Sequence, residues 1–227
     1  MIPRPSNAKT VSIVALFVSL ILATDYGLAP IPNVKLVDTL VFACAFVFGF
    51  RMGAYVALAS ELIWGVISPY GFGQYIIPFL AVGELLYAFA GWGASRIWNG
   101  EEISTLSPRN TYFGALLCIC AFIWDTETNL ATGLLQLIAQ GHITLSGLML
   151  FEGTGLIFMI PHEITDLVFG SLLAPIVILY FTRRLRGGAL TISSKQEEKE
   201  TVVSRISSEE GEGRVNDNTD PSRSIEL

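Results

Sequence analysis

The sequence is 227 residues long, and 52% of its residues are hydrophobic while only 15% are charged. Soluble domains usually carry about 25% charged residues, so this composition argues against a soluble globular protein and favours one embedded in a bilayer. The formal net charge is −6, and the basic residues form no stripe beyond a short cluster at 183–186. Nucleic-acid binding is therefore not expected.

Six apolar segments follow one another along the chain, separated by proline, glycine and polar residues. They cover residues 11–29, 36–50, 52–68, 75–97, 112–139 and 161–182. A helix needs about 20 residues to cross a bilayer, so we expect the second and third segments to extend into their turns. Residues 145–160 are apolar but interrupted by glycines, and we expect an external loop or partial helix there. The sequence thus predicts an all-α integral membrane protein with six transmembrane helices.

The distribution of lysine and arginine orients these helices. Given six spans, one side of the membrane holds eight basic residues and the other holds only Lys35. The eight are Arg4, Lys9, Arg51, Arg96, Arg109, Arg183, Arg184 and Arg186. Because basic loops stay in the cytoplasm, we expect both termini there, in a multi-pass protein of the cell membrane. Residues 11–29 also loosely fit a cleaved signal peptide, although the run is long enough to span.

The chain is expected to divide after residue 186. Residues 1–186 are predicted to form a six-helix transmembrane substrate-binding domain. Residues 187–227 are rich in Ser, Glu, Gly and Asp and contain no aromatic residue. Such a segment cannot bury enough apolar area to fold alone, so a disordered acidic cytoplasmic tail is expected.

Polar side chains inside the fifth segment follow one helical face. Asp125, Thr128, Asn129 and Thr132 fall at i, i+3, i+4 and i+7, which makes a single stripe. Charges in a bilayer are costly and usually face a cavity or a partner. This stripe therefore indicates a lined site, and the alternative is hydrogen bonding that holds helices together.

A second polar stripe opens the sixth segment, with His162, Thr165 and Asp166 at i, i+3 and i+4. Two stripes at similar depth favour a binding site over inter-helix contacts. Glu61 and Glu84 also lie within apolar segments, and each fits a site or close helix packing equally well.

The run from His162 to Asp166 resembles part of a zinc-binding helix, in which two histidines stand at i and i+4 with a glutamate between them. Here Asp166 takes the place of the second histidine. A mixed His/Asp metal site is chemically feasible, but the chain has only two histidines, and we expect no metal. There is also no GxxxxGK[ST] or GxGxxG motif, so we expect no ATP hydrolysis by this chain. An enzyme would be expected to show more convergent histidine or nucleophile residues, so we do not expect one.

Small residues form a ridge along the first segment. Ala15, Ser19 and Ala23 fall at i, i+4 and i+8, a spacing that lets a second helix approach closely. Periodicity alone favours packing within the same bundle.

Further segments join these stripes and this ridge in a recognisable order. They are Pro-Ile-Pro-Asn-Val-Lys at 30–35, Phe-Gly-Phe-Arg-Met-Gly-Ala at 48–54, Pro-Tyr-Gly-Phe-Gly at 69–73, Asp-Thr-Glu-Thr-Asn at 125–129 and Pro-His-Glu at 161–163. In this order and size, residues 11–184 resemble the substrate-binding S component of an energy-coupling factor (ECF) vitamin transporter. No single motif is diagnostic, and the long acidic tail departs from the pattern.

The resemblance implies a chain without cofactor or catalysis that binds one vitamin-like small molecule near the external face. Its partners would be a transmembrane coupling subunit, contacted by Ala15, Ser19 and Ala23, and two ATPase subunits that use ATP. The implied ligand-binding residues are Asn33, Gln74, Glu84, Asp125, Asn129, His162 and Asp166. The alternatives are an integral membrane enzyme or an ion-coupled carrier that uses the buried carboxylates and His162.

Overall fold

The computed structural model describes residues 7–69, 75–98, 103–105 and 107–215, with side chains up to Leu185. It divides into two units, Met1–Thr182 and Arg183–Leu227, each described by itself. In the described part, every regular element is a helix. The elements are α1 (Asn7–Leu28), α2 (Val37–Phe48), α3 (Phe50–Ile67), α4 (Ile77–Gly83), α5 (Leu85–Ile97), the 3₁₀ helix η1 (Pro108–Asn110), α6 (Thr111–Ala139) and α7 (Leu145–Val215).

The predicted all-α class and the predicted apolar helices are confirmed. Among the described residues, four stretches are long and apolar enough to cross a membrane: Asn7–Leu28, Phe50–Ile67, Ile77–Ile97 and Leu145–Leu185. Helix α2 is apolar but has only 12 residues, a length of about 18 Å. Helix α6 has 29 residues and is not among these four stretches.

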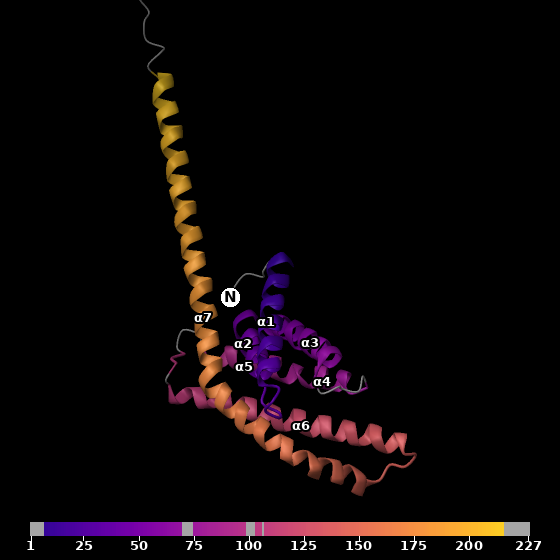
Figure 1. Ribbon diagram of the computed structural model, residues 1–227. Helices are drawn as coiled ribbons and strands as arrows, with labels where there is room; N and C mark the ends of the chain where they lie inside the picture. Colours follow the sequence, from indigo (N-terminus) through magenta and orange to yellow (C-terminus); the bar gives the residue numbers. More distant parts are fainter. Residues whose placement is uncertain (1–6, 70–74, 99–102, 106, 216–227) are drawn as a thin grey trace, which may run out of the picture. The chain divides into compact units, whose positions relative to one another are not determined.

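Helix α2 forms the centre of the first unit. Every residue from Val37 to Phe46 is buried, as expected for a helix that is hydrophobic on all sides. It packs against α3 and α5 (Figure 1). The contact with α5 is very close at Gly91, where a Cβ atom would lie 2.1 Å from the Phe42 carbonyl oxygen. Only glycine fits this helix crossing.

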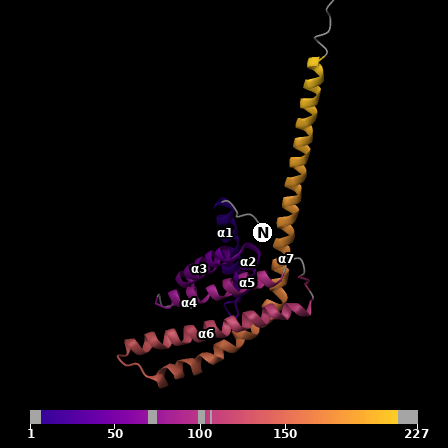
Figure 2. The ribbon, with the colours of Figure 1, turned by 180° about the vertical axis from the view of Figure 1, so that it is seen from behind.

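Helix α6 and the first part of α7 form an antiparallel hairpin, which Figures 1 and 2 show from opposite sides. The connection turns at Gly141, whose φ of 81° favours glycine. Along the hairpin, a Cβ atom at Gly114 would lie 2.2 Å from the Leu167 carbonyl oxygen, and one at Gly170 would lie 2.8 Å from Gly114 Cα. The two backbones therefore approach closely through glycine.

The predicted loop or partial helix at 145–160 is instead the continuous first part of α7, and Pro161 lies inside the helix rather than at its start. The glycines that suggested interruptions are contact points. A Cβ atom at Gly155 would lie 2.1 Å from Asn129 Nδ2, and one at Gly147 would lie 2.9 Å from Leu137 Cδ1. These glycines let α7 lie against α6 without ending the helix.

Helix α7 continues through the second unit to Val215. The disordered acidic tail expected at 187–227 stays a prediction. The segment contains the run Lys-Gln-Glu-Glu-Lys-Glu at 195–200. Lysine, glutamine and glutamate are strong helix formers even without an apolar face, which accounts for a helix in a segment that lacks a core of its own.

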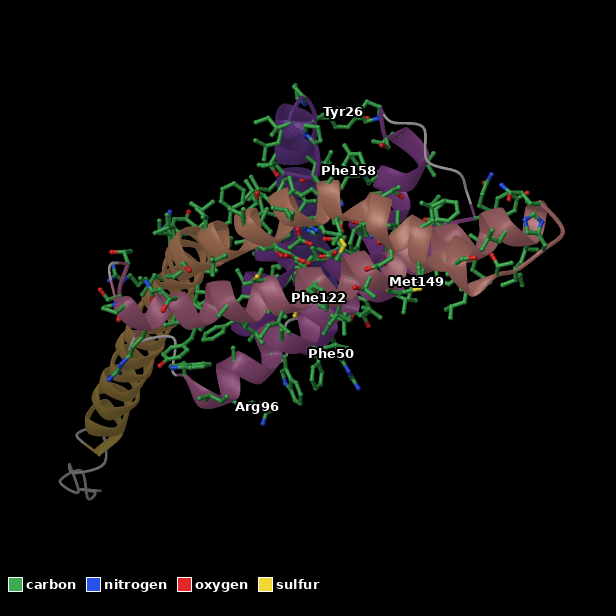
Figure 3. The ribbon with its side chains drawn as sticks, turned by 90° about the horizontal axis from the view of Figure 1, so that it is seen from below. Tyr26, Phe50, Arg96, Phe122, Met149 and Phe158 are labelled. Carbon is green, nitrogen blue, oxygen red and sulfur yellow. The ribbon has the colours of Figure 1, made fainter. Side chains whose placement is uncertain are left out.

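Large apolar side chains cover the outside of the first unit. Val66, Ile157 and Met149 are 79%, 72% and 67% exposed, and Figure 3 labels Met149 together with Phe122 and other outward side chains. Soluble proteins rarely expose contiguous apolar surface on this scale. A lipid environment explains it.

The Gly91 contact yields a matched pair of variants. Gly91→Ala places a methyl group against the α2 backbone, so we expect the free energy of unfolding to fall by about 1–3 kcal/mol, as for other overpacked sites. A Cβ atom at Gly93, on the same helix, meets nothing within 4 Å. Gly93→Ala should therefore leave stability unchanged or raise it by up to about 1 kcal/mol through helix propensity. Thermal unfolding in detergent compares the two, and equal melting temperatures would contradict the close packing.

Candidate functional site

A buried histidine joins three helices. His162 on α7 is fully buried. Its Nδ1 lies 2.9 Å from Asp125 Oδ2 on α6, and its Nε2 lies 3.2 Å from Asp38 Oδ2 on α2. A doubly protonated imidazole donates to both carboxylates. The arrangement therefore ties α2, α6 and α7 together through one side chain.

Buried acids outnumber the buried bases around this histidine. The buried acidic residues of the described part are Asp25, Asp38, Glu61, Glu84, Asp125 and Asp166. The basic groups that act on them are His162 and the partly buried Lys35. Among the described residues, the carboxylate oxygens of Glu84 and Asp166 have no hydrogen-bond partner. Because an unpaired buried charge is costly, this cluster favours shared protons or a bound group that brings positive charge or hydrogen-bond donors.

A cavity of about 580 Å³ opens beside the cluster. This volume is within the usual range for small-molecule sites. The side chains that line it are Asp25, Ala29, Ile31, Asn33, Val34, Lys35, Trp64, Tyr75, Ile76, Leu80, Trp124, Asp125, Thr128, Asn129, Thr132, Leu135, Gln136, Ala139 and Phe158. All four residues of the polar stripe on α6 therefore line one cavity, together with aromatic side chains from α3, α6 and α7.

Lys35 supplies a positive charge at the cavity wall. Its Nζ lies 4.3 Å from the centre of the Trp124 ring, a cation–π contact. Burial alone would lower the pKa of Lys35, but nearby carboxylates, those of Glu61 and Asp38 above all, outweigh burial and raise that pKa. Lys35 therefore stays protonated and balances part of the acidic charge.

Asn33 positions the connection that carries Lys35. Its φ is 58°, a left-handed conformation that asparagine tolerates better than most residues. Its Nδ2 donates a hydrogen bond of 2.8 Å to the Phe158 carbonyl oxygen, and Figure 3 labels Phe158 on α7. The side chain of Asn33 thus fastens the α1–α2 connection to α7 at the edge of the cavity.

The predicted ligand-binding residues are only partly brought together. Asn33, Asp125 and Asn129 line the cavity. His162 contacts Asp125 from behind the cavity wall. Glu84, at the break between α4 and α5, and Asp166 are fully buried and do not line it, and Gln74 lies outside the described residues.

Two buried acids, Asp25 and Asp38, were not predicted as site residues. Lys35 was predicted on the external side but not among the ligand-binding residues. Asp125 was selected because it is an acid within an apolar segment. The same rule applies to Asp25 and Asp38, since each lies near an end of such a segment. Acids at such positions fit the membrane interface equally well, so their burial depends on which helices pack together.

The small-residue ridge lies on the exposed face of α1. Ala15, Ser19 and Ala23 are exposed, while Phe17 and Ile21 bury the opposite face. In the described part, the ridge therefore does not pack within the bundle, which corrects the expectation from periodicity alone.

No protein-family model, no curated protein and no solved structure matches the chain.

Replacing His162 tests its role in holding the helices. His162→Gln leaves two buried carboxylates without their shared donor, and breaking a buried pair in this way costs about 3–5 kcal/mol. We expect a matching loss in the free energy of unfolding, measured by denaturant or thermal unfolding in detergent. His142→Gln, at an exposed position, serves as the control. Adding Asp38→Asn to His162→Gln should recover part of the loss, and a His162→Gln variant as stable as the His142 variant would refute the bridge.

Proposed function

We propose that this chain is the solute-binding S component of an ECF-type transporter, which captures a vitamin-like small molecule for uptake driven by partner subunits. The observation that carries the proposal is the cavity of about 580 Å³. It is lined by a fixed polar stripe on α6 and by aromatic side chains, the usual composition of a small-molecule site.

In this proposal six segments cross the cell membrane, namely α1, α2, α3, α4 with α5, α6 and α7. The exposed apolar side chains support the membrane environment. The excess of basic residues on one predicted side supports cytoplasmic termini. The cavity would then face outward with Lys35, the basic residue expected outside.

The lining indicates the chemistry of the ligand. Asp25 and Asp125 favour a group that is positively charged or donates hydrogen bonds. Trp124 and Phe158 offer apolar ring surfaces, and Lys35 can meet one acceptor or anionic group. A small nitrogen heterocycle fits these features. A ligand with several phosphates does not, because its negative charges would face two carboxylates and only one ammonium group.

The exposed ridge supports an external partner. Side chains as small as Ala15, Ser19 and Ala23 let another helix approach closely. A coupling subunit in the membrane is the partner that such a surface fits. Two ATPase subunits would supply the energy, since this chain has no ATP-binding motif.

An ion-coupled carrier is the second candidate, favoured by one observation. The membrane segment Ile77–Ile97 contains Glu84, which is fully buried without a hydrogen-bond partner in the described part. Ionisable side chains inside membrane segments often belong to ion or proton pathways. Uptake by this chain alone in proteoliposomes, driven by an ion gradient and without ATP, would favour the carrier.

Identification of the ligand is the first experiment. The chain is purified in mild detergent, denatured, and its released small molecules are analysed by mass spectrometry. The proposal expects one stoichiometric organic compound with the chemistry described above. A cavity filled only by lipid or detergent would argue against it.

Asp125 should then contribute directly to affinity. Losing one charge-assisted hydrogen bond costs about 1.5–3 kcal/mol, so we expect Asp125→Asn to weaken binding about ten- to 150-fold. Titration calorimetry with the identified compound measures this. Glu127→Gln, two residues away and outside the cavity lining, is the control. Equal affinity in both variants would move the binding site elsewhere.

The ridge should matter for assembly and not for binding. Ser19→Leu places a large side chain at the centre of the exposed face, so co-purification with the coupling subunit and uptake should be lost while the isolated chain still binds its ligand. Val11→Leu, at the rim of the same face, should behave as wild type. An intact complex with Ser19→Leu would show that this face meets lipid.

A further inference from the structure

We infer that Asp38, His162 and Asp166 form a binding site for a divalent transition-metal ion, of which Zn²⁺ is the best-fitting example. These residues come from α2 and α7 and do not line the cavity. The three proposed metal ligands are therefore distinct from the residues that line the cavity, and metal binding goes beyond the proposed function.

The three side chains have the geometry of a ligand set. Their ligand atoms lie within 4.8 Å of one another. His162 Nε2 and Asp38 Oδ2 are 3.2 Å apart, and two atoms so placed, each about 2.1 Å from an ion, subtend roughly 100° at it. That angle lies between octahedral and tetrahedral values. A shift of roughly 1.5 Å at most would bring Asp166 to tetrahedral spacing.

Asp125 completes the arrangement from outside the ligand set. A metal-binding histidine usually donates its other ring N–H to a carboxylate, which fixes the tautomer and the ring orientation. Asp125 Oδ2 lies 2.9 Å from His162 Nδ1. When the ion binds, Nε2 loses its proton to solvent and becomes a metal ligand, as metal binding to histidine requires. The contact with Asp125 keeps the other proton on Nδ1.

The buried carboxylate of Asp166 is independent evidence for a bound cation. It is fully buried, and neither of its carboxylate oxygens has a hydrogen-bond partner among the described residues. The nearby Tyr87 hydroxyl is a potential donor to Asp166, but neither this hydroxyl nor the carboxylate oxygens reach hydrogen-bond geometry in the described part. A divalent ion between Asp38 and Asp166 would satisfy these oxygens and neutralise part of the acidic excess.

The donor set selects the class of ion. One imidazole nitrogen and two carboxylates suit Zn²⁺, Mn²⁺, Fe²⁺ or Co²⁺, whereas Mg²⁺ and Ca²⁺ prefer oxygen ligands alone. Because the ligands join α2 to α7 and Asp125 adds α6, a bound ion would act by locking these helices together. Binding to the folded state alone raises stability with ion concentration.

The test measures metal binding by the full-length chain, purified with an affinity tag that contains no histidine. Protein stripped with a chelator and dialysed is titrated with Co²⁺, whose visible absorption reports coordination, and with Zn²⁺ in competition. We expect one equivalent to bind, Zn²⁺ to displace Co²⁺, and the melting temperature to rise with Zn²⁺. Absence of saturable Co²⁺ binding by folded protein, or displacement by equimolar Mg²⁺, would overturn the inference.

Near-isosteric variants locate the ion. Asp166→Asn and Asp38→Asn should each lower Co²⁺ affinity at least tenfold, and Asp125→Asn should lower it about 10–100-fold through the histidine. Glu163→Gln, which lies between the two α7 ligands and outside the set, should bind as wild type. Circular dichroism of the metal-free variants confirms folding. Wild-type affinity in a folded Asp166→Asn or Asp38→Asn variant would show that the ion binds elsewhere and would contradict the proposed site.

Discussion

The imidazole of His162 between two carboxylates is the contact on which the arrangement of the inner helices depends. It reaches Asp125 on α6 with one nitrogen and Asp38 on α2 with the other. Away from water such a network is strongly stabilising when complete and costly when any member is missing. Because Asp125 also lines the cavity, the same contact fixes one wall of that cavity.

Glycine determines how closely the helices approach this centre. At Gly91 and Gly114 the neighbouring helix backbone occupies the place of a side chain. Apolar side chains gain little from leaving lipid for another apolar surface, so helices in a bilayer depend on such close contacts and on polar groups between them. The bundle combines both, with glycine at the crossings and ionisable groups in the middle.

Local pattern predicted much of this structure and failed where distant segments meet. The apolar segments became helices, and the stripe containing Asp125 and Asn129 faces a cavity, because helical periodicity is a local property. Asp38 was missed because its partner His162 lies 124 residues away and no spacing rule links them. The start of α7 was misread because Gly147 and Gly155 resemble helix breaks in sequence, while in the structure they contact α6. The exposure of the Ser19 face likewise depends on which side of α1 the rest of the bundle covers.

The shortness of α2 has a consequence for the interior of the bundle. Its 12 residues extend about 18 Å, against a hydrocarbon core of about 30 Å. Because residues 37–46 of α2 are buried among other helices, the missing length lies inside the bundle and not at its outer surface. The α1–α2 connection, with Asn33 and Lys35 in the cavity lining, leads directly into this short helix. A short central helix thus makes room for polar groups within a largely apolar protein.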